Sequence, residues 1–179
     1  GSLQAFLEFF EDIFSDPFGE VQLASIRHEE KILVSGVGNL NKLEPRGYGK
    51  STRSILGAVW ACWRGSQDFV MDCCDSTEKS TDLLKLALCV LSESEAMLGL
   101  FPELWPFHKL NGNSHRCAYQ TYKGEKTKIS IKGDTIYFPV LGGKYPCEGA
   151  MIVARPFKKA RGKNVEARRP SVVILDDVQ

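Results

Sequence analysis

The segment "LEPRGYGKSTRS" at residues 43–54 constrains the fold more than any other part of the sequence. Gly49, Lys50 and Ser51 form the end of a phosphate-binding loop, in which backbone N–H groups and a helix N-terminus converge on phosphate oxygens. The glycine that usually opens such a loop is absent, and Glu44 stands in its place. Because these loops join a strand to a helix, the segment predicts an α/β fold.

The hydrophobic pattern around this loop indicates alternating helices and strands. Apolar residues at helical spacing over 50–63 predict a helix that starts at the lysine, and residues 40–44 are a candidate strand leading into the loop. The compact run "DFVMDCC" at 68–74 suits a buried parallel strand. The other expected elements are helices over 3–14, 20–34 and 77–98, an irregular connection over 101–117, a β-hairpin over 126–140 turning at Gly133-Asp134, and a strand over 149–155.

A second motif, "VVILDD", lies near the end of the chain. Residues 172–175 are apolar and predict a buried strand, and Asp176 and Asp177 follow at its carboxyl end, where ligands sit in open α/β sheets. We expect Asp176 to bind Mg²⁺ and Asp177 to orient the water that attacks the γ-phosphate. Each motif alone also suits an ordinary turn, but both in this order favour a nucleotide site.

The chemistry of the loop gives each polar group at its end a role. Lys50 supplies a positive charge for the β- and γ-phosphates, and the hydroxyl of Ser51 takes a coordination place on Mg²⁺. The expected cofactors are therefore ATP and Mg²⁺.

Three stretches of the chain resemble the ATPase domain of the large terminase subunit of tailed bacteriophages, the motor that packages viral DNA. The resemblance covers most of residues 20–179. "PRGYGKST" is similar to the family's variant loop, in which Arg-x-x-Gly-Lys-Ser/Thr replaces the glycine-led form. The other two stretches are "DSTEKSTDLLKLALCVLSESEAMLGLFPEL", a Thr followed by a helix with an acidic end, and "KKARGKNVEARRPSVVILDDVQ", with Arg-Gly, Arg-Pro and then a strand ending in Asp-Asp.

The resemblance implies a P-loop NTPase fold of the ASCE type, with a mainly parallel sheet flanked by helices and the hairpin as an addition. It also implies ATP hydrolysis that drives double-stranded DNA into a procapsid. The implied partners are DNA, the portal protein, the small terminase subunit and further copies of this chain in a ring. The implied place is the cytoplasm of the infected bacterial host.

The resemblance also implies site residues. Arg46 matches the family's loop arginine, and its planar, charged guanidinium suits charge that spreads over a transferring phosphoryl group. The alternative is a surface ion pair between Arg46 and Glu44. Arg161 and Arg168 lie in a basic stretch, which is either a contact with DNA or a neighbouring subunit or a solvated loop. The implied nucleotide-binding residues are Pro45, Arg46, Gly47, Tyr48, Gly49, Lys50, Ser51 and Thr52, and the candidates for adenine contact are Gln22, Arg27 and His28.

Two departures from the family matter. A glutamate is commoner than aspartate in the role expected of Asp177, and aspartate is one methylene shorter. The chain also stops two residues after Asp177, so further strands and an RNase H-like nuclease domain are expected outside this fragment. We take residues 3–179 as one N-terminal ATPase domain, with Gly1-Ser2 as a cloning remnant.

Composition limits the other classes of function. The net charge of +1 gives no overall attraction to nucleic acid or membranes, and no apolar run approaches the roughly 20 residues of a bilayer span. The six cysteines form no Cys-x-x-Cys pair, which favours buried thiols in a reducing cytoplasm. Two rival functions stay open: a helicase-like nucleic-acid translocase, and a nucleotide-binding scaffold module without turnover.

Overall fold

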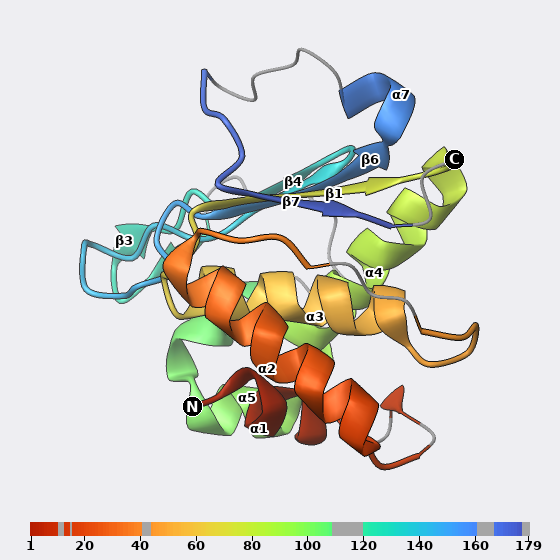
Figure 1. Cartoon of the computed structure of the whole chain (residues 1–179). Coiled ribbons are helices and arrows are strands. Elements are labelled where there is room, and N and C mark those ends of the chain that lie inside the picture. The colour runs from red at the N-terminus through yellow and green to blue at the C-terminus, as the bar shows by residue number, and fades with distance from the viewer. Residues whose placement is uncertain (11–12, 15, 41–43, 109–119, 161–166, 177–179) are drawn as a thin grey trace.

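The computed structural model describes residues 1–10, 13–14, 16–40, 44–108, 120–160 and 167–176. Its centre is a five-stranded sheet with helices on both faces, so the expected α/β class is confirmed (Figure 1). The strand order is β4-β5-β6-β1-β7. The strands are β1 (Phe69–Cys74), β4 (Ser130–Lys132), β5 (Thr135–Tyr137), β6 (Met151–Pro156) and β7 (Val172–Leu175), and a separate two-stranded ribbon holds β2 (Thr121–Tyr122) and β3 (Glu125–Lys126).

The sheet is parallel on one side and antiparallel on the other. Strand β1 pairs in parallel with β6, where Phe69 lies opposite Met151, and with β7, where Val70 lies opposite Val172. Strand β5 is antiparallel to both β6 and β4. The hairpin predicted over 126–140 is therefore confirmed as β4 and β5, and it extends the sheet on the side away from β7.

The helices largely follow the hydrophobic pattern. The helix predicted over 50–63 has those bounds, but the one predicted over 3–14 ends at Glu8, and the one predicted over 77–98 breaks at Ser94. The Ser94 side chain accepts a hydrogen bond from Met97 N and caps a new helix, a role that serine favours over a helix interior. The helices are α1 (Leu3–Glu8), α2 (Glu20–Ser35), α3 (Lys50–Trp63), α4 (Thr77–Glu93), α5 (Glu95–Leu100), α6 (Trp105–His108) and α7 (Phe157–Ala160), with a 3₁₀ turn η2 (Pro102–Leu104).

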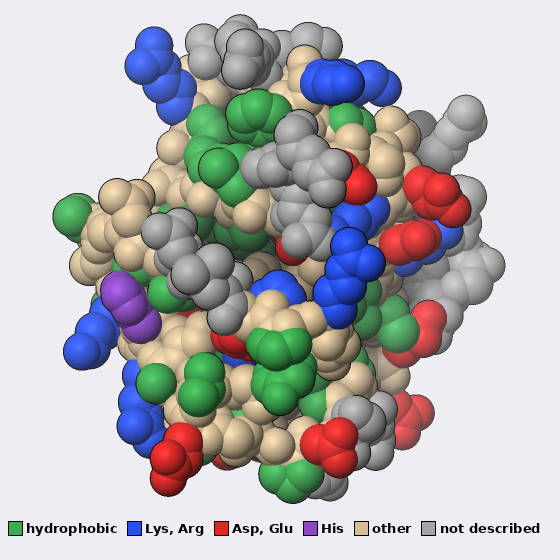
Figure 2. Space-filling view, turned by 45° about the vertical axis from the view of Figure 1, so that its right-hand side comes forward, with side chains coloured by type: hydrophobic (Ala, Val, Ile, Leu, Met, Phe, Trp, Pro, Cys, Tyr) green, Lys and Arg blue, Asp and Glu red, His purple; other side chains and the backbone are tan. Residues whose placement is uncertain are grey.

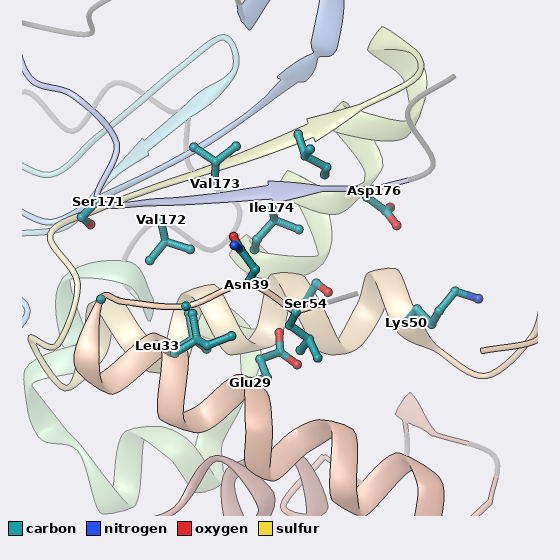
Figure 3. A pocket seen from close by; sticks show the side chains of 15 residues that line it. Glu29, Leu33, Asn39, Lys50, Ser54, Ser171, Val172, Val173, Ile174 and Asp176 are labelled. Atoms are coloured by element: carbon teal, nitrogen blue, oxygen red, sulfur yellow. The ribbon is translucent and has the colours of Figure 1, made fainter. Parts of the chain in front are cut away.

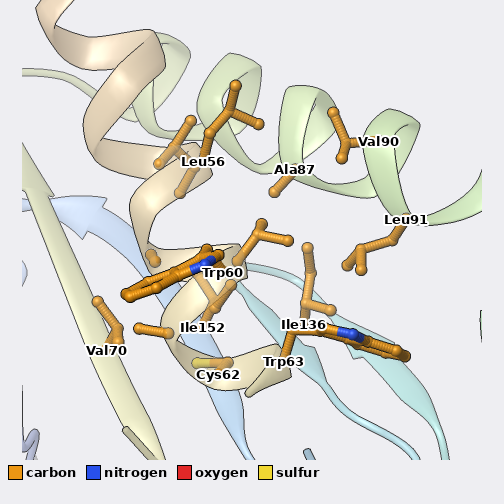
Figure 4. Close-up of a cluster of buried hydrophobic side chains, with 14 of the residues drawn as sticks. Leu56, Trp60, Cys62, Trp63, Val70, Ala87, Val90, Leu91, Ile136 and Ile152 are labelled. Carbon is orange, nitrogen blue, oxygen red and sulfur yellow. The ribbon is translucent and has the colours of Figure 1, made fainter. Parts of the chain in front are cut away.

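Helix α3 lies at the centre of the molecule: α4 packs beside it on the same face of the sheet, and α2 covers its side away from the sheet (Figure 1). Every residue from Arg53 to Trp63 is buried, so the helix has a fixed position under the sheet. A second, smaller cluster of apolar residues covers the other face of β1 and β6, beneath α7. Figure 4 shows the main core, in which Leu56 and Trp60 of α3, Val70 and Ile152 of the sheet, and Ala87 and Val90 of α4 gather.

Strand β7 is the last strand on its side of the sheet among the described residues. Val172 and Ile174 pack against the main core, whereas Val173 and Leu175 are 53% and 57% exposed. The prediction of a fully buried strand is therefore wrong for one of its faces. The reason is that alternate side chains point to opposite faces of a sheet, and only the face toward α3 is covered.

Gly65 fixes the turn between α3 and β1. Its φ is +73°, and a Cβ at this position would lie 2.6 Å from the backbone oxygen of Pro146. We expect Gly65→Ala to lower the free energy of unfolding by about 2–4 kcal/mol, because it adds a backbone clash to a left-handed conformation. Gly133→Ala is the matched control, since φ there is +56° but a Cβ would meet no heavy atom within 4 Å. Urea unfolding measures both, and equal losses would contradict the role of the Pro146 contact.

Candidate functional site

The predicted phosphate loop ends where α3 begins. Gly49 has a φ of +67° and is the N-cap of α3, so the helix starts at Lys50 as expected. Arg53 N donates to Gly49 O at 2.9 Å, which is the first hydrogen bond of the helix ladder. The earlier N–H groups of a helix have no partner within it, and together with the helix dipole they favour an anion at this position.

Lys50 folds back over the start of the loop. Its Nζ donates to the carbonyl oxygens of Glu44 at 2.7 Å and Pro45 at 2.9 Å. The ammonium group therefore ties the two ends of the loop together. Lys50 also lines one end of the cavity along β7.

Asp176 lies directly after β7, next to the first turn of α3. Asp176 N donates to Cys73 O at 2.8 Å, which continues the ladder with β1 beyond the strand. The hydroxyl of Ser51 donates to Asp176 Oδ1 at 2.9 Å, and the residue is 7% exposed. Two motifs that are 125 residues apart in the chain are thus in direct contact, and the predicted role of both residues in binding Mg²⁺ stays a prediction.

Lys79 also contacts Asp176, and this contact was not predicted from the sequence. Its Nζ lies 3.0 Å from Asp176 Oδ2. Lys79 is in the first turn of α4, where Ser76 is the N-cap and accepts a hydrogen bond from Lys79 N. A helix N-terminus favours negative charge, so a lysine in the first turn of a helix is unusual. This position was the feature of the sequence from which an acidic partner of Lys79 could have been predicted.

A buried ion pair lies beneath the loop. The guanidinium of Arg53 pairs with the carboxylate of Glu44, and the side chains are 0% and 4% exposed. Glu44 stands where a glycine usually opens such a loop, and its side chain turns inward to α3. Glu44 is therefore not the surface partner considered for Arg46, which lies exposed in the turn of the loop. Nothing in the sequence around Arg53 marked it as buried.

A cavity of about 790 Å³ runs along β7, between this strand, α3 and the C-terminal half of α2 (Figure 3). Lys50 and Asp176 lie at one end of it and Ser171 at the other, while Val172 and Ile174 form its wall toward the sheet. The predicted site is thus one end of an elongated hollow. The remaining labelled lining residues are Glu29, Leu33, Asn39, Ser54 and Val173.

Three residues were candidates for adenine contact, and the structure shows one of them, Gln22, in contact with the loop. Its Nε2 donates to Tyr48 O at 3.4 Å, and its Oε1 accepts from Gly19 N at 2.9 Å. Arg27 and His28 are exposed on α2.

Two described basic residues near the end of the chain, Arg155 and Arg168, have internal partners. Arg168 donates to Gly149 O at 2.9 Å and to the carboxylate of Asp68 at 2.7 Å, and Arg155 pairs with Asp134 at 2.9 Å. Arg168 therefore connects the chain before β7 to the start of β1. Its contact with DNA or a neighbouring subunit stays a prediction. Arg161 and Asp177 lie outside the described residues, and so do positions 41–43 of the predicted strand before the loop, while Leu40 and Glu44 are not in a strand.

The chemistry of the site suits Mg²⁺ better than a soft metal. Among the described residues no three His, Cys, Asp or Glu side chains form a metal-binding group, and Asp176 and Ser51 offer one carboxylate and one hydroxyl. Mg²⁺ is commonly held by one or two carboxylates together with substrate phosphates and water.

Burial, with the nearby carboxylates of Asp72 and Asp176, raises the pKa of the Cys74 thiol, so this thiol stays neutral at neutral pH.

The surface around the site has mixed charge. On the face shown in Figure 2, basic and acidic side chains are interspersed rather than gathered by sign. Within the described residues no helix is long and apolar enough to cross a membrane. A polyanion would therefore be attracted to the visible face by individual charged side chains and not by one large area of positive charge.

The site is defined by its own residues: a helix N-terminus, a lysine at the loop, and a hydroxyl in contact with a carboxylate at a strand end. Comparisons of the chain with models of protein families, with curated proteins and with solved structures found no match.

Proposed function

We propose that this chain is the Mg²⁺-dependent ATPase domain of a DNA-packaging motor of the phage terminase type. The observation that carries the proposal is the 2.9 Å hydrogen bond from Ser51 to Asp176. It joins the two residues that a P-loop enzyme uses to hold Mg²⁺, and they come from opposite ends of the chain.

The triphosphate of ATP binds at the N-terminus of α3, within the backbone of residues 45–52. Lys50 already lies over this loop, and its charge balances that of the β- and γ-phosphates. Ser51 and Asp176 hold the metal ion, which supplies further positive charge to the phosphate oxygens when bound. Asp177 orients the attacking water, and Arg46, exposed in the loop, reaches the γ-phosphate.

The arrangement of strands supports a P-loop fold of the ASCE type. Strand β7 runs parallel to β1, and its carboxyl end meets the first turn of α3. Ligands of open α/β sheets bind at the carboxyl ends of parallel strands, which is where Lys50, Ser51 and Asp176 gather.

Translocation of double-stranded DNA in a ring of subunits, on a portal and with a small terminase subunit in an infected cell, is part of this proposal. It rests on the resemblance of three sequence stretches to the terminase family. The site itself supports the ATPase step.

A nucleotide-binding module without turnover is the second candidate. The observation that favours it is the contact of Lys50 with two carbonyls of its own loop, because a lysine used in this way can stabilise the loop alone.

The test measures binding of a fluorescent ATP analogue and release of phosphate, each with and without Mg²⁺ and double-stranded DNA. We expect phosphate release that requires Mg²⁺, and binding that persists without Mg²⁺ but is strengthened by it. Binding without phosphate release under every condition would support the scaffold module instead. Absence of nucleotide binding would overturn both.

Arg46→Ala tests the role of the loop arginine. We expect phosphate release to fall about tenfold or more while affinity for the ATP analogue changes little, because an arginine of this type acts on charge in the transition state. Arg64→Ala is the matched control: Arg64 is exposed at the other end of α3, where it stacks on Trp60. Similar rates for the two variants would contradict a catalytic role for Arg46.

A further inference from the structure

Both oxygens of the Asp176 carboxylate have a partner from this chain. Ser51 donates to Oδ1 at 2.9 Å, and the ammonium of Lys79 lies 3.0 Å from Oδ2. The Asp176 side chain is 9% exposed and that of Lys79 is 28% exposed. A carboxylate with so little access to water needs a partner of opposite charge, and Lys79 supplies one.

The position of Lys79 in its helix is otherwise unfavourable. It is in the first turn of α4, where the helix dipole disfavours a positive charge. The contact with Asp176 offsets this cost. The ion pair with Asp176 therefore explains why a lysine stands at this position, although the start of a helix disfavours a positive charge.

The surroundings of Lys79 offer a second place for its ammonium. A shallow hollow at the start of α4 is lined by Lys79 together with three carboxylates. These belong to Asp75, Glu78 and Asp82, which are exposed. A lysine side chain has four rotatable bonds, so its charge can move from the partly buried carboxylate to this acidic rim.

We propose that Lys79 is the resident counter-ion of the metal carboxylate and exchanges with Mg²⁺ at Asp176 when Mg·ATP binds. This inference rests on the proposed function. A divalent cation and an ammonium group held by the two oxygens of one carboxylate repel each other, so the two occupy Asp176 in turn. Lys79 thereby keeps Asp176 ionised and in place, and it weakens metal binding by competition. Nucleotide loading then moves a side chain at the start of α4, which follows the central strand β1.

Lys79→Met tests the exchange with two measurements. The first is the Mg²⁺ concentration that half-saturates binding of a fluorescent ATP analogue, and we expect it to fall about tenfold because the competing charge is gone. The second is the melting temperature without nucleotide, in EDTA and in Mg²⁺. We expect Lys79→Met to melt below the wild type in EDTA and to gain more than the wild type from Mg²⁺, because the metal replaces the lost charge.

Lys85→Met is the matched control, since Lys85 is on the same helix and forms an exposed pair with Asp82. It should behave as wild type in both measurements, and Lys79→Arg should stay close to wild type because it keeps the charge. If Lys79→Met does not fold, Lys79→Gln takes its place.

An unchanged or higher Mg²⁺ requirement in the neutral variants would overturn the exchange. A higher requirement with weaker nucleotide binding at saturating Mg²⁺ would instead make Lys79 a direct ligand of the nucleotide. Failure of the wild type to bind the ATP analogue at any Mg²⁺ concentration is a separate result, and it would overturn the proposed function itself.

Discussion

Asp176→Asn is expected to lower Mg²⁺-dependent ATP turnover by about 10²–10³-fold, the cost of removing one preorganised charge from a catalytic site. Asparagine has nearly the same shape, and its amide oxygen can still accept the hydrogen bond that Ser51 donates at 2.9 Å. It has no negative charge, however, so it holds a divalent cation poorly. The substitution therefore removes the proposed metal ligand and keeps the contact between the loop and β7.

The measurement is phosphate release across a range of Mg²⁺ concentrations, alongside binding of the ATP analogue without metal. We expect binding without metal to persist, because the helix N-terminus and Lys50 do not depend on the Asp176 charge. Glu125→Gln is the control, since Glu125 is an exposed carboxylate on β3 that lines neither the cavity along β7 nor the hollow at α4. Turnover within about twofold of wild type in Asp176→Asn would contradict the assignment of Asp176 as the metal ligand, since a lost charge of this kind costs far more.

Much of the fold could be predicted because its signals are local. The helix over 50–63 has an apolar stripe and a left-handed glycine before it, and its bounds are confirmed at Lys50 and Trp63. The hairpin could be predicted from alternation around Gly133, whose φ is +56°. The contact of Ser51 with Asp176 could be predicted as well, because the carboxyl ends of parallel strands and the loops after them meet at one edge of a sheet.

The features that could not be predicted depend on partners distant in the chain. Arg53 and Lys79 are ordinary charged residues on helices until the fold places Glu44 beside one and Asp176 beside the other. The exposure of Leu175 has the same origin, because a strand's burial depends on what covers each face of the sheet. The roles of Asp177 and Arg161 stay predictions, since both lie outside the described residues.

Arg53→Met is expected to lower the free energy of unfolding by about 3–5 kcal/mol, the typical cost of removing one partner from a buried ion pair. The methionine fills much of the volume of the arginine stem but leaves the Glu44 carboxylate, 4% exposed, without its guanidinium partner. Replacing both partners by apolar groups avoids this cost, so Glu44→Leu/Arg53→Met should recover most of the lost stability. Lys85→Met is the surface control, and its exposed pair should contribute less than about 1 kcal/mol.

Urea unfolding of the single, double and control variants gives these free energies, and the single variant also tests the loop. The Glu44 carbonyl accepts a hydrogen bond from Lys50 Nζ at 2.7 Å, so movement of Glu44 displaces the lysine that we propose binds the phosphates. We therefore expect Arg53→Met to weaken binding of the ATP analogue at temperatures where the variant is fully folded. A single variant as stable as the surface control, with unchanged nucleotide affinity, would show that the buried pair does not hold the loop. Loss of affinity in both the single and the double variant would instead establish Glu44 as the residue that anchors the loop to α3 in place of the missing glycine.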